Sequence, residues 1–286
     1  MSAATATAIE TSQREFGFTR EDFERVRRLI HAHAGIALAS SKAHMVYSRL
    51  SRRLRVLGLS TFSGYLDRLE HGDDAAEWQA FVNSLTTNLT SFFREAHHFT
   101  ELSKLLLRRK PGERIVLWCA AASTGEEPYS LAITAAETFG TLTPPVTILA
   151  TDIDTQVLAT AERGIYPLER IADLSAERKR KFFLKGVGAN SEQCRVVDAL
   201  RQMVTFRELN LLDAQYPMRG PFTAIFCRNV MIYFDKPTQR ELLRRYHGLL
   251  EPDGLLFVGH SESLLDNSLG FQSLGQTIYR RKGDPA

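Results

Sequence analysis

The sequence predicts an α/β protein with a Rossmann-like domain on a mostly parallel sheet, an N-terminal all-helical domain and a small antiparallel β insertion. Residues 18–85 show only helical periodicity, whereas strand-like and helix-like runs alternate from residue 114 onward. The alternation is interrupted between residues 167 and 203, which predicts the insertion. With 286 residues, 44% of them hydrophobic, the chain is long enough for one large or two modest domains.

The N-terminal part is expected to contain a disordered tail over residues 1–17 and a helical domain over residues 18–86. The first 12 residues are rich in Ala and Thr and lack the basic and apolar segments of a signal peptide. Glycines at 35, 58 and 72 stand at plausible helix ends. The predicted helices cover residues 22–30, 42–57, 61–69 and 75–85.

The α/β domain is expected over residues 87–286, with the insertion at about 167–203. Its predicted strands cover residues 114–118, 146–151, 204–209, 222–227, 254–259 and about 276–281. Its predicted helices cover residues 126–139, 155–163 and 237–250. Within the insertion we expect a helix over 175–183 and a strand over 193–197.

The bulk properties exclude several classes of protein. A net charge of +3 is too small to indicate a nucleic-acid partner. No apolar run reaches the roughly 20 residues needed to cross a bilayer, so no membrane insertion is expected. Three well-separated cysteines predict neither a disulfide framework nor a thiolate metal site. We therefore expect a cytoplasmic monomer.

The segment 119–130 is the first candidate binding site. A predicted strand there breaks into small residues with one glycine and turns into a helix, which lets backbone N–H groups approach a ligand. Glu126 and Glu127 stand where a pyrophosphate site would have glycines, so the ligand is expected to be cationic or hydroxyl-rich, and a nicotinamide-dependent dehydrogenase is disfavoured. An ordinary strand-to-helix turn is the alternative.

An acid ends the next predicted strand. Asp152 is placed to bind ribose hydroxyls, whereas the alternative role, capping the following helix, fits Asp154 better. An adenosine-bearing cofactor that carries a positive sulfonium and no phosphate satisfies both the loop and the acid. The sequence therefore indicates S-adenosylmethionine.

Five strings carry a resemblance to a known family: residues 88–99, 121–129, 150–154, 225–235 and 252–262. Together they resemble the CheR family of chemotaxis-receptor protein-glutamate methyltransferases, in order over nearly the whole chain. The resemblance implies S-adenosylmethionine-dependent glutamate O-methylation with S-adenosylhomocysteine as product. The rival interpretation is a non-catalytic, cofactor-sensing adaptor, which retention of Arg94 and Tyr233 disfavours.

The resemblance also implies roles for individual residues. Arg94 is expected to align the acceptor carboxylate, with a structural salt bridge as the alternative. Tyr233 is expected to donate a hydrogen bond to that carboxylate or to close over the methyl group, with a core aromatic role as the alternative. The expected cofactor-binding residues are Asn88, Thr90, Arg94, Ala121, Glu127, Asp152, Asn210, Leu211, Arg228 and Asn229.

Other catalytic arrangements are not expected. A glutamate acceptor is already ionised at neutral pH, so methyl transfer needs no general base. His97 and His98 lack the i, i+4 spacing of helical metal ligands, and residues 259–263 lack the final glycine of a nucleophile elbow. We therefore expect no metal and structural roles for both segments.

Two surfaces are expected to meet the substrate. Lys42, Arg49, Arg52 and Arg53 form a basic stripe on a predicted helix, for which a merely solvated face is the alternative. The resemblance implies that this stripe recognises acidic helices of chemotaxis receptors. The turn from Gly186 to Gly188 is a candidate docking site for a receptor's C-terminal tail peptide, with an ordinary hairpin turn as the alternative.

Overall fold

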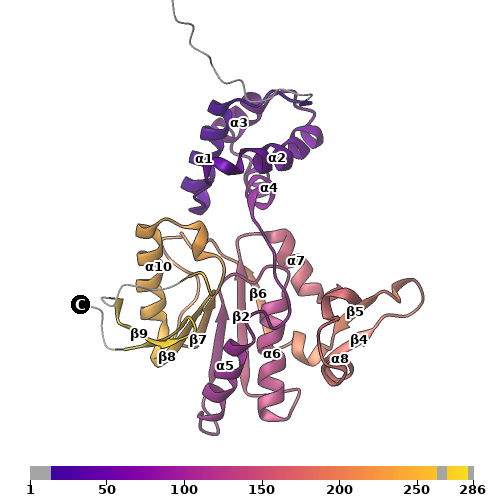
Figure 1. Cartoon of the computed structure of the whole chain (residues 1–286), viewed down its shortest axis with the longest axis vertical. Coiled ribbons are helices and arrows are strands. Elements are labelled where there is room, and N and C mark those ends of the chain that lie inside the picture. Colours follow the sequence, from indigo (N-terminus) through magenta and orange to yellow (C-terminus); the bar gives the residue numbers. More distant parts are fainter. Residues whose placement is uncertain (1–13, 263–268, 283–286) are drawn as a thin grey trace, which may run out of the picture. The chain divides into compact units, whose positions relative to one another are not determined.

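The computed structural model describes residues 14–262 and 269–282, which divide into two compact units. The first unit contains Leu38–Leu85 and the described residues up to Ala32. The second contains His33–Ala37 and the chain from Thr86 onward (Figure 1). Of the tail expected over residues 1–17, the first 13 lie outside the described residues.

The first unit is helical, as predicted. Thr61 accepts a hydrogen bond from the backbone of Gly64 and so caps the third helix, while Gly58 ends the second in the left-handed conformation at φ 66°. Leucines, phenylalanines and tyrosines on the inner helix faces form its core. The helices are α1 (Arg20–Ala34), α2 (Ala43–Leu57), α3 (Phe62–His71) and α4 (Ala75–Leu85).

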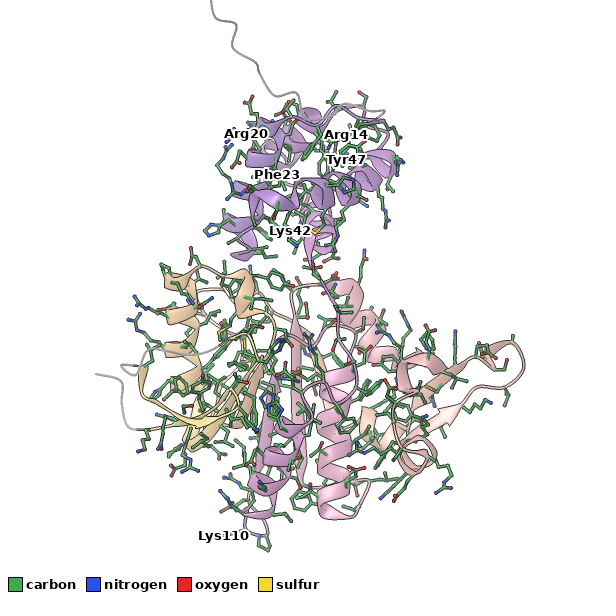
Figure 2. The ribbon with its side chains drawn as sticks, viewed as in Figure 1. Arg14, Arg20, Phe23, Lys42, Tyr47 and Lys110 are labelled. Atoms are coloured by element: carbon green, nitrogen blue, oxygen red, sulfur yellow. The ribbon has the colours of Figure 1, made fainter. Side chains whose placement is uncertain are left out.

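Residues directly before α1 pack on this unit. Phe16 is buried, and its ring centroid lies 6.4 Å from that of Phe62. The Arg14 guanidinium lies 4.9 Å from the Tyr47 ring centroid (Figure 2). The sequence assigned residues 14–17 to the tail, but the aromatic side chain at position 16 has an apolar core to enter and draws this segment onto the helices.

The second unit is built on a seven-stranded, mostly parallel sheet with the order β6-β2-β1-β7-β8-β10-β9, which confirms the predicted class. Only β10 runs antiparallel, to both β8 and β9. The strands are β1 (Ile115–Cys119), β2 (Val146–Asp152), β6 (Val204–Glu208), β7 (Phe222–Cys227), β8 (Leu250–Val258), β9 (Phe271–Gly275) and β10 (Ile278–Arg281).

Helices cover both faces of this sheet (Figure 1). Leu117 of β1 packs in one apolar cluster with Leu102 and Ala132, whereas the next residue, Trp118, packs in a second cluster with Tyr246. Alternate side chains of a central strand thus enter two cores, as in doubly wound folds. The helices are α5 (His97–Leu107), α6 (Glu126–Phe139), α7 (Thr155–Arg163) and α10 (Lys236–Leu249).

The interruption is a three-stranded antiparallel sheet of the order β3-β5-β4, so the predicted β insertion is confirmed. The predicted helix and strand are α8 (Ala176–Phe182) and β5 (Gln193–Val196). Two further strands, β3 (Ile165–Pro167) and β4 (Phe183–Lys185), have three residues each, too few to show a period. The chain returns to the main sheet through α9 (Asp198–Arg201).

Helix α5 and strand β9 were not predicted. The leucines of Glu101–Leu107 have the spacing of an amphipathic helix, and Leu102 and Leu106 are buried, so the signal for α5 was present. Strand β8 begins at Leu250 rather than at residue 254, because α10 passes into it without an intervening loop.

Candidate functional site

The segment after β1 lies where the chain order of the sheet reverses. Strand β1 pairs with β2 on one side and with β7 on the other. The backbone N–H of Ala120 donates to Phe226 O at 2.8 Å, and that of Ala122 donates to Thr151 O at 2.9 Å. The loop 120–125 is thus tied to both neighbouring strands at their carboxyl ends, where ligands bind in open α/β sheets.

The glycine of this loop serves packing. Gly125 has φ 100°, and a Cβ there would lie 2.6 Å from Tyr166 Oη and 2.8 Å from Ala161 Cβ. Only glycine lets the start of α6 approach α7 and β3 this closely. From the sequence, Gly125 was expected to let a ligand approach the backbone. In the structure, the glycine is needed because α7 and β3 pack closely against this position.

Asp152 ends β2 beside this loop. Its Oδ2 accepts from Ser123 N at 2.8 Å, and its Oδ1 accepts from Asp154 N at 3.0 Å. Burial raises the pKa of Asp152 to about 6, although the backbone N–H groups oppose that rise. Each oxygen keeps capacity for a further hydrogen bond. Asp154 caps α7 through Gln156 N and Val157 N, as the sequence predicted.

Asn88 lies in the same group. Its Nδ2 donates to Asp154 Oδ2 at 2.8 Å, and its carbonyl accepts from Ser123 Oγ at 2.9 Å. The carbonyl of Thr90, farther along this segment, accepts from Arg170 Nη1 at 3.3 Å. Asn88 therefore stands beside Asp152, the expected ribose acid, through shared contacts with Ser123 and Asp154.

Arg228 forms the centre of a second group. It is 5% exposed, and its Nη1 donates to Glu127 Oε2 at 2.5 Å while its Nη2 donates to Arg94 O at 2.5 Å. Glu95 Oε2 lies 3.4 Å from Nη2. Burial acts to lower the pKa of Arg228, but the two carboxylates outweigh it and raise the pKa. The guanidinium is therefore fixed in its charged form.

Glu95 and His98 were not predicted as members of the site. Burial, and next the charge of Arg228, lower the pKa of His98 to about 4, and its Nε2 lies 3.0 Å from Gln276 O. A neutral ring that donates through Nε2 directs the lone pair of Nδ1 toward Glu95 Oε2, 3.6 Å away. Within the described residues, Glu95 Oε2, His98 Nδ1 and Arg228 Nε have no hydrogen-bond partner.

Arg94 is half-buried, and its Nη1 donates to Leu89 O at 3.0 Å. It forms no ion pair with any described residue, so the structural salt bridge that was its alternative role is not observed. The two residues flanking it on either side, Phe93 and Glu95, have φ 54° and 58°, an unfavourable conformation for side chains of this size.

The turn after β7 carries Asn229 and Tyr233. Asn229 has φ 57°, and its N–H donates to Glu262 Oε2 at 2.8 Å. Tyr233 is half-buried. Glu262 was not predicted as a site residue, although it stands in one of the five strings. An acid within one of the five strings, shortly after the predicted strand over 254–259, is the signal that would have found it.

Asn210 and Leu211 follow β6. Asn210 Oδ1 accepts from Leu212 N at 3.0 Å, which is the turn-forming role weighed as its alternative. Its Nδ2 donates to His33 O at 2.7 Å. Leu211 is buried in the second apolar cluster of the sheet. Ala121, in the loop after β1, is partly exposed.

The basic stripe is only partly a free surface. Lys42 and Arg52 are exposed, but Arg49 Nη1 donates to Ser84 O at 3.4 Å. Arg53 forms an ion pair with Glu77, which is 4% exposed. A buried carboxylate on α4 thus holds the partly exposed guanidinium of Arg53, and the docking role of this residue stays a prediction.

One group of potential metal ligands occurs among the described residues. Glu95, His97 and His98 each place a ligand atom within 4.8 Å of the others. The Arg228 guanidinium, 3.4 Å from Glu95, and the positive N-terminal end of α5 both oppose a cation there. Within the same residues, no helix is both long and apolar enough to cross a membrane.

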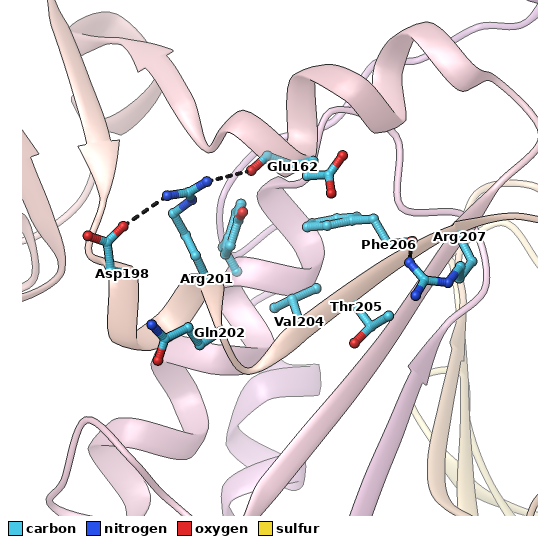
Figure 3. A pocket seen from close by; sticks show the side chains of 9 residues that line it. Glu162, Asp198, Arg201, Gln202, Val204, Thr205, Phe206 and Arg207 are labelled. Atoms are coloured by element: carbon cyan, nitrogen blue, oxygen red, sulfur yellow. Dashed lines mark hydrogen bonds and ion pairs between the residues drawn. The ribbon is translucent and has the colours of Figure 1, made fainter.

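A cavity of about 320 Å³ lies apart from these groups, between β6, α7 and α9. Arg201 spans its wall, donating to Asp198 Oδ1 at 2.9 Å and to Glu162 O at 3.0 Å (Figure 3). Tyr129 and Phe206 supply its apolar side. No predicted site residue lines this cavity.

The sheet order, the helical unit, the β insertion and the acid at the end of β2 define a Rossmann-like S-adenosylmethionine-dependent methyltransferase. Residues 88–280 match the family described as CheR methyltransferase, SAM binding domain, and residues 21–86 match CheR methyltransferase, all-alpha domain. The chain belongs to the CheR methyltransferase family.

Similar proteins cover the whole chain. Chemotaxis protein methyltransferase 2 of Pseudomonas aeruginosa is 53% identical over 98% of this chain and 99% of its own length. The chemotaxis protein methyltransferase of Salmonella typhimurium is 50% identical over 100% and 98%. The match to the solved structure of PKMT2 from Rickettsia typhi in complex with AdoHcy spans 60% of this chain and 26% of that chain, with 17% identity and a TM-score of 0.36. This likeness is too low to support an inference about the chain.

Proposed function

We propose that this protein methylates glutamate side chains of chemotaxis receptors with S-adenosylmethionine, producing glutamate methyl esters and S-adenosylhomocysteine. The observation that carries the proposal is the match of residues 88–280 to a SAM-binding methyltransferase domain whose relatives are named chemotaxis protein methyltransferases. Those names support a role in chemotaxis, and Arg94, which forms no ion pair among the described residues, supports a carboxylate acceptor.

The residues present fit the proposed cofactor. A zwitterionic methionine end needs one cation and one anion, and Arg228 and Glu127 offer both side by side, together with polar atoms that lack partners. Asp152 offers two buried oxygens for ribose hydroxyls. Bound S-adenosylmethionine supplies an electrophilic methyl group. Asn88, Thr90, Ala121, Asn210, Leu211 and Asn229 complete the proposed pocket.

The acceptor needs alignment more than activation. A glutamate carboxylate has a reference pKa of about 4.3, so it is ionised at neutral pH and needs no base. Arg94 is anchored at one nitrogen by Leu89 O and keeps other donors for a carboxylate. Tyr233 can donate its phenolic proton to the same group. The site thus orients two oppositely charged reactants and excludes water between them.

Two surfaces are proposed to hold the receptor. Lys42 and Arg52 remain exposed for acidic receptor helices. The insertion leaves β4 at the edge of its sheet, next to the turn that contains Gly186 and Gly188, where an extended tail peptide can add as a further strand. Lys185 of that strand is exposed and suits an acidic peptide.

The test is incubation of the purified protein with radiolabelled S-adenosylmethionine and receptor-containing membranes. We expect label on the receptor that is released as methanol by mild base, since carboxyl methyl esters hydrolyse there. Membranes in which the receptor glutamates are changed to glutamine are the control. Receptor binding with no label transferred would instead support the adaptor.

A further inference from the structure

Glu262 is a buried carboxylate whose hydrogen bonds all reach backbone N–H groups. It is 6% exposed. Its Oε2 accepts from Gly259 N at 2.6 Å and from Asn229 N at 2.8 Å, and its Oε1 accepts from Ile232 N at 3.2 Å. One side chain at the end of β8 thus holds both ends of the turn that follows β7.

The turn itself is tightly built against the end of β8. A Cβ at Gly259 would lie 2.3 Å from Asn229 Nδ2, so only glycine permits this approach. Gln239 of α10 fixes the far side of the turn, donating to Met231 O at 2.8 Å and to Phe234 O at 3.0 Å. The backbone of Tyr233 therefore lies between anchored residues on both sides.

The charge of Glu262 suits this task. Three N–H donors need both oxygens as acceptors, which the ionised form provides and a protonated form does not. Burial raises the pKa of Glu262, and the donated backbone hydrogen bonds oppose that rise. Carboxylate hydrogen bonds to backbone N–H groups are stronger than neutral ones, so the turn is held firmly.

We propose that Glu262 is a positioning residue for methyl transfer, fixing the turn from Asn229 to Tyr233 so that Tyr233 meets the acceptor at the correct place. The inference rests on the proposed function for the identity of the acceptor. Glu262 does not touch the reacting atoms in this scheme and acts through the backbone of the turn.

The test compares Glu262→Gln with the wild type and with Glu251→Gln. The amide keeps one acceptor oxygen, which can serve Gly259 and Asn229, and turns an NH₂ group toward Ile232. We expect S-adenosylhomocysteine affinity within about threefold of the wild type and kcat per cofactor-binding molecule lowered about tenfold or more, since a misplacement of about 1 Å can cost roughly a hundredfold.

Glu251 is a suitable control because it is a partly buried glutamate near the start of β8, where it pairs with Arg109 at 2.8 Å, away from the turn. Glu251→Gln is expected to lower the melting temperature and leave kcat unchanged. Tyr233→Phe is expected to resemble Glu262→Gln in kcat while keeping the turn fixed. A purely structural Glu262 would lower the active fraction and the melting temperature, with kcat per active molecule unchanged, and that result overturns the proposal.

Amide hydrogen exchange tests the positioning step without any acceptor. Exchange of the peptide covering residues 229–233 should accelerate in Glu262→Gln, while β1 and α6 keep wild-type protection. Unchanged exchange in this peptide also overturns the proposal. If the wild type methylates no receptor, the proposed function fails, whereas the exchange result still decides whether Glu262 fixes the turn.

Discussion

Each unit pairs an arginine with a buried glutamate, and the two clusters differ in how completely their buried polar atoms are paired. In the helical unit, Arg53 donates to both oxygens of Glu77, and Tyr65 Oη donates to Glu77 Oε1 at 2.8 Å. None of the buried side-chain polar atoms of these three residues lacks a hydrogen-bond partner. Such a closed network suits a structural role.

In the other unit, the Arg228 cluster is open. Its members leave Arg228 Nε, Glu95 Oε2 and His98 Nδ1 buried without a hydrogen-bond partner among the described residues. The backbone beside it is held at positive φ at Phe93 and Glu95. Unpaired buried atoms and strained backbone together are typical of ligand sites. We therefore expect the Arg53 pair to serve structure and the Arg228 pair to serve binding.

Replacing Arg228 and, in a separate variant, Arg53 is expected to give the largest difference between the two clusters. Arg228→Met leaves two buried carboxylates without a cation and should cost about 3–5 kcal/mol of the free energy of unfolding. It should also weaken S-adenosylhomocysteine binding by about 1.5–3 kcal/mol, since a charged hydrogen-bond donor is lost. Urea unfolding and titration calorimetry measure the two effects.

Arg53→Met is the matched variant. It should also destabilise the protein by about 3–5 kcal/mol, because Glu77 loses its charge partner, yet cofactor affinity measured on the folded fraction should not change. Equal losses of cofactor affinity in both variants would refute the assignment of one cluster to structure and the other to binding.

The Arg94→Ala variant tests whether Arg94 aligns the acceptor carboxylate without contributing an ion pair to the fold. Its guanidinium contacts Leu89 O and no described carboxylate, so its loss should leave the free energy of unfolding nearly unchanged. Methyl transfer should fall roughly a hundredfold, because the acceptor carboxylate loses its alignment. Single-turnover transfer of labelled methyl groups gives the rate. A wild-type rate would remove Arg94 from the mechanism.

The raised pKa of Asp152 predicts that cofactor binding depends on pH. Its pKa of about 6 means that the carboxylate becomes protonated as pH falls from 7.5 to 5. Ribose hydroxyls donate to the ionised form, so affinity should be highest above pH 7 and about tenfold weaker at pH 5, one unit below that pKa. Calorimetry with S-adenosylhomocysteine measures this. Asp152→Asn should bind weakly at every pH, and an identical slope in that variant would assign the titration elsewhere.

Local sequence signals predicted most strands, most helices and the acids at strand ends, because periodicity and end signals are read within a few residues. Asp152 and Asp154 were distinguished in this way. Long-range pairing was not accessible: Arg53 meets Glu77, 24 residues away, and Arg228 meets Glu127, 101 residues away. The role of Glu262 likewise depends on contacts of a side chain with backbone about 30 residues earlier.

The smallest expected effect concerns the exposed part of the basic stripe, Lys42 and Arg52, in contrast to Arg53, which is paired with Glu77. Reversing both to glutamate should leave stability and cofactor affinity unchanged and lower kcat/KM for receptor methylation by about threefold to tenfold at low salt, because exposed charges mainly steer encounter. The effect should shrink near 0.15 M salt, where charges are screened beyond about 8 Å. Arg20→Glu with Arg28→Glu, exposed on α1, makes the same change in net charge and serves as the control. If the two double variants methylate receptor equally, the stripe is only a solvated face.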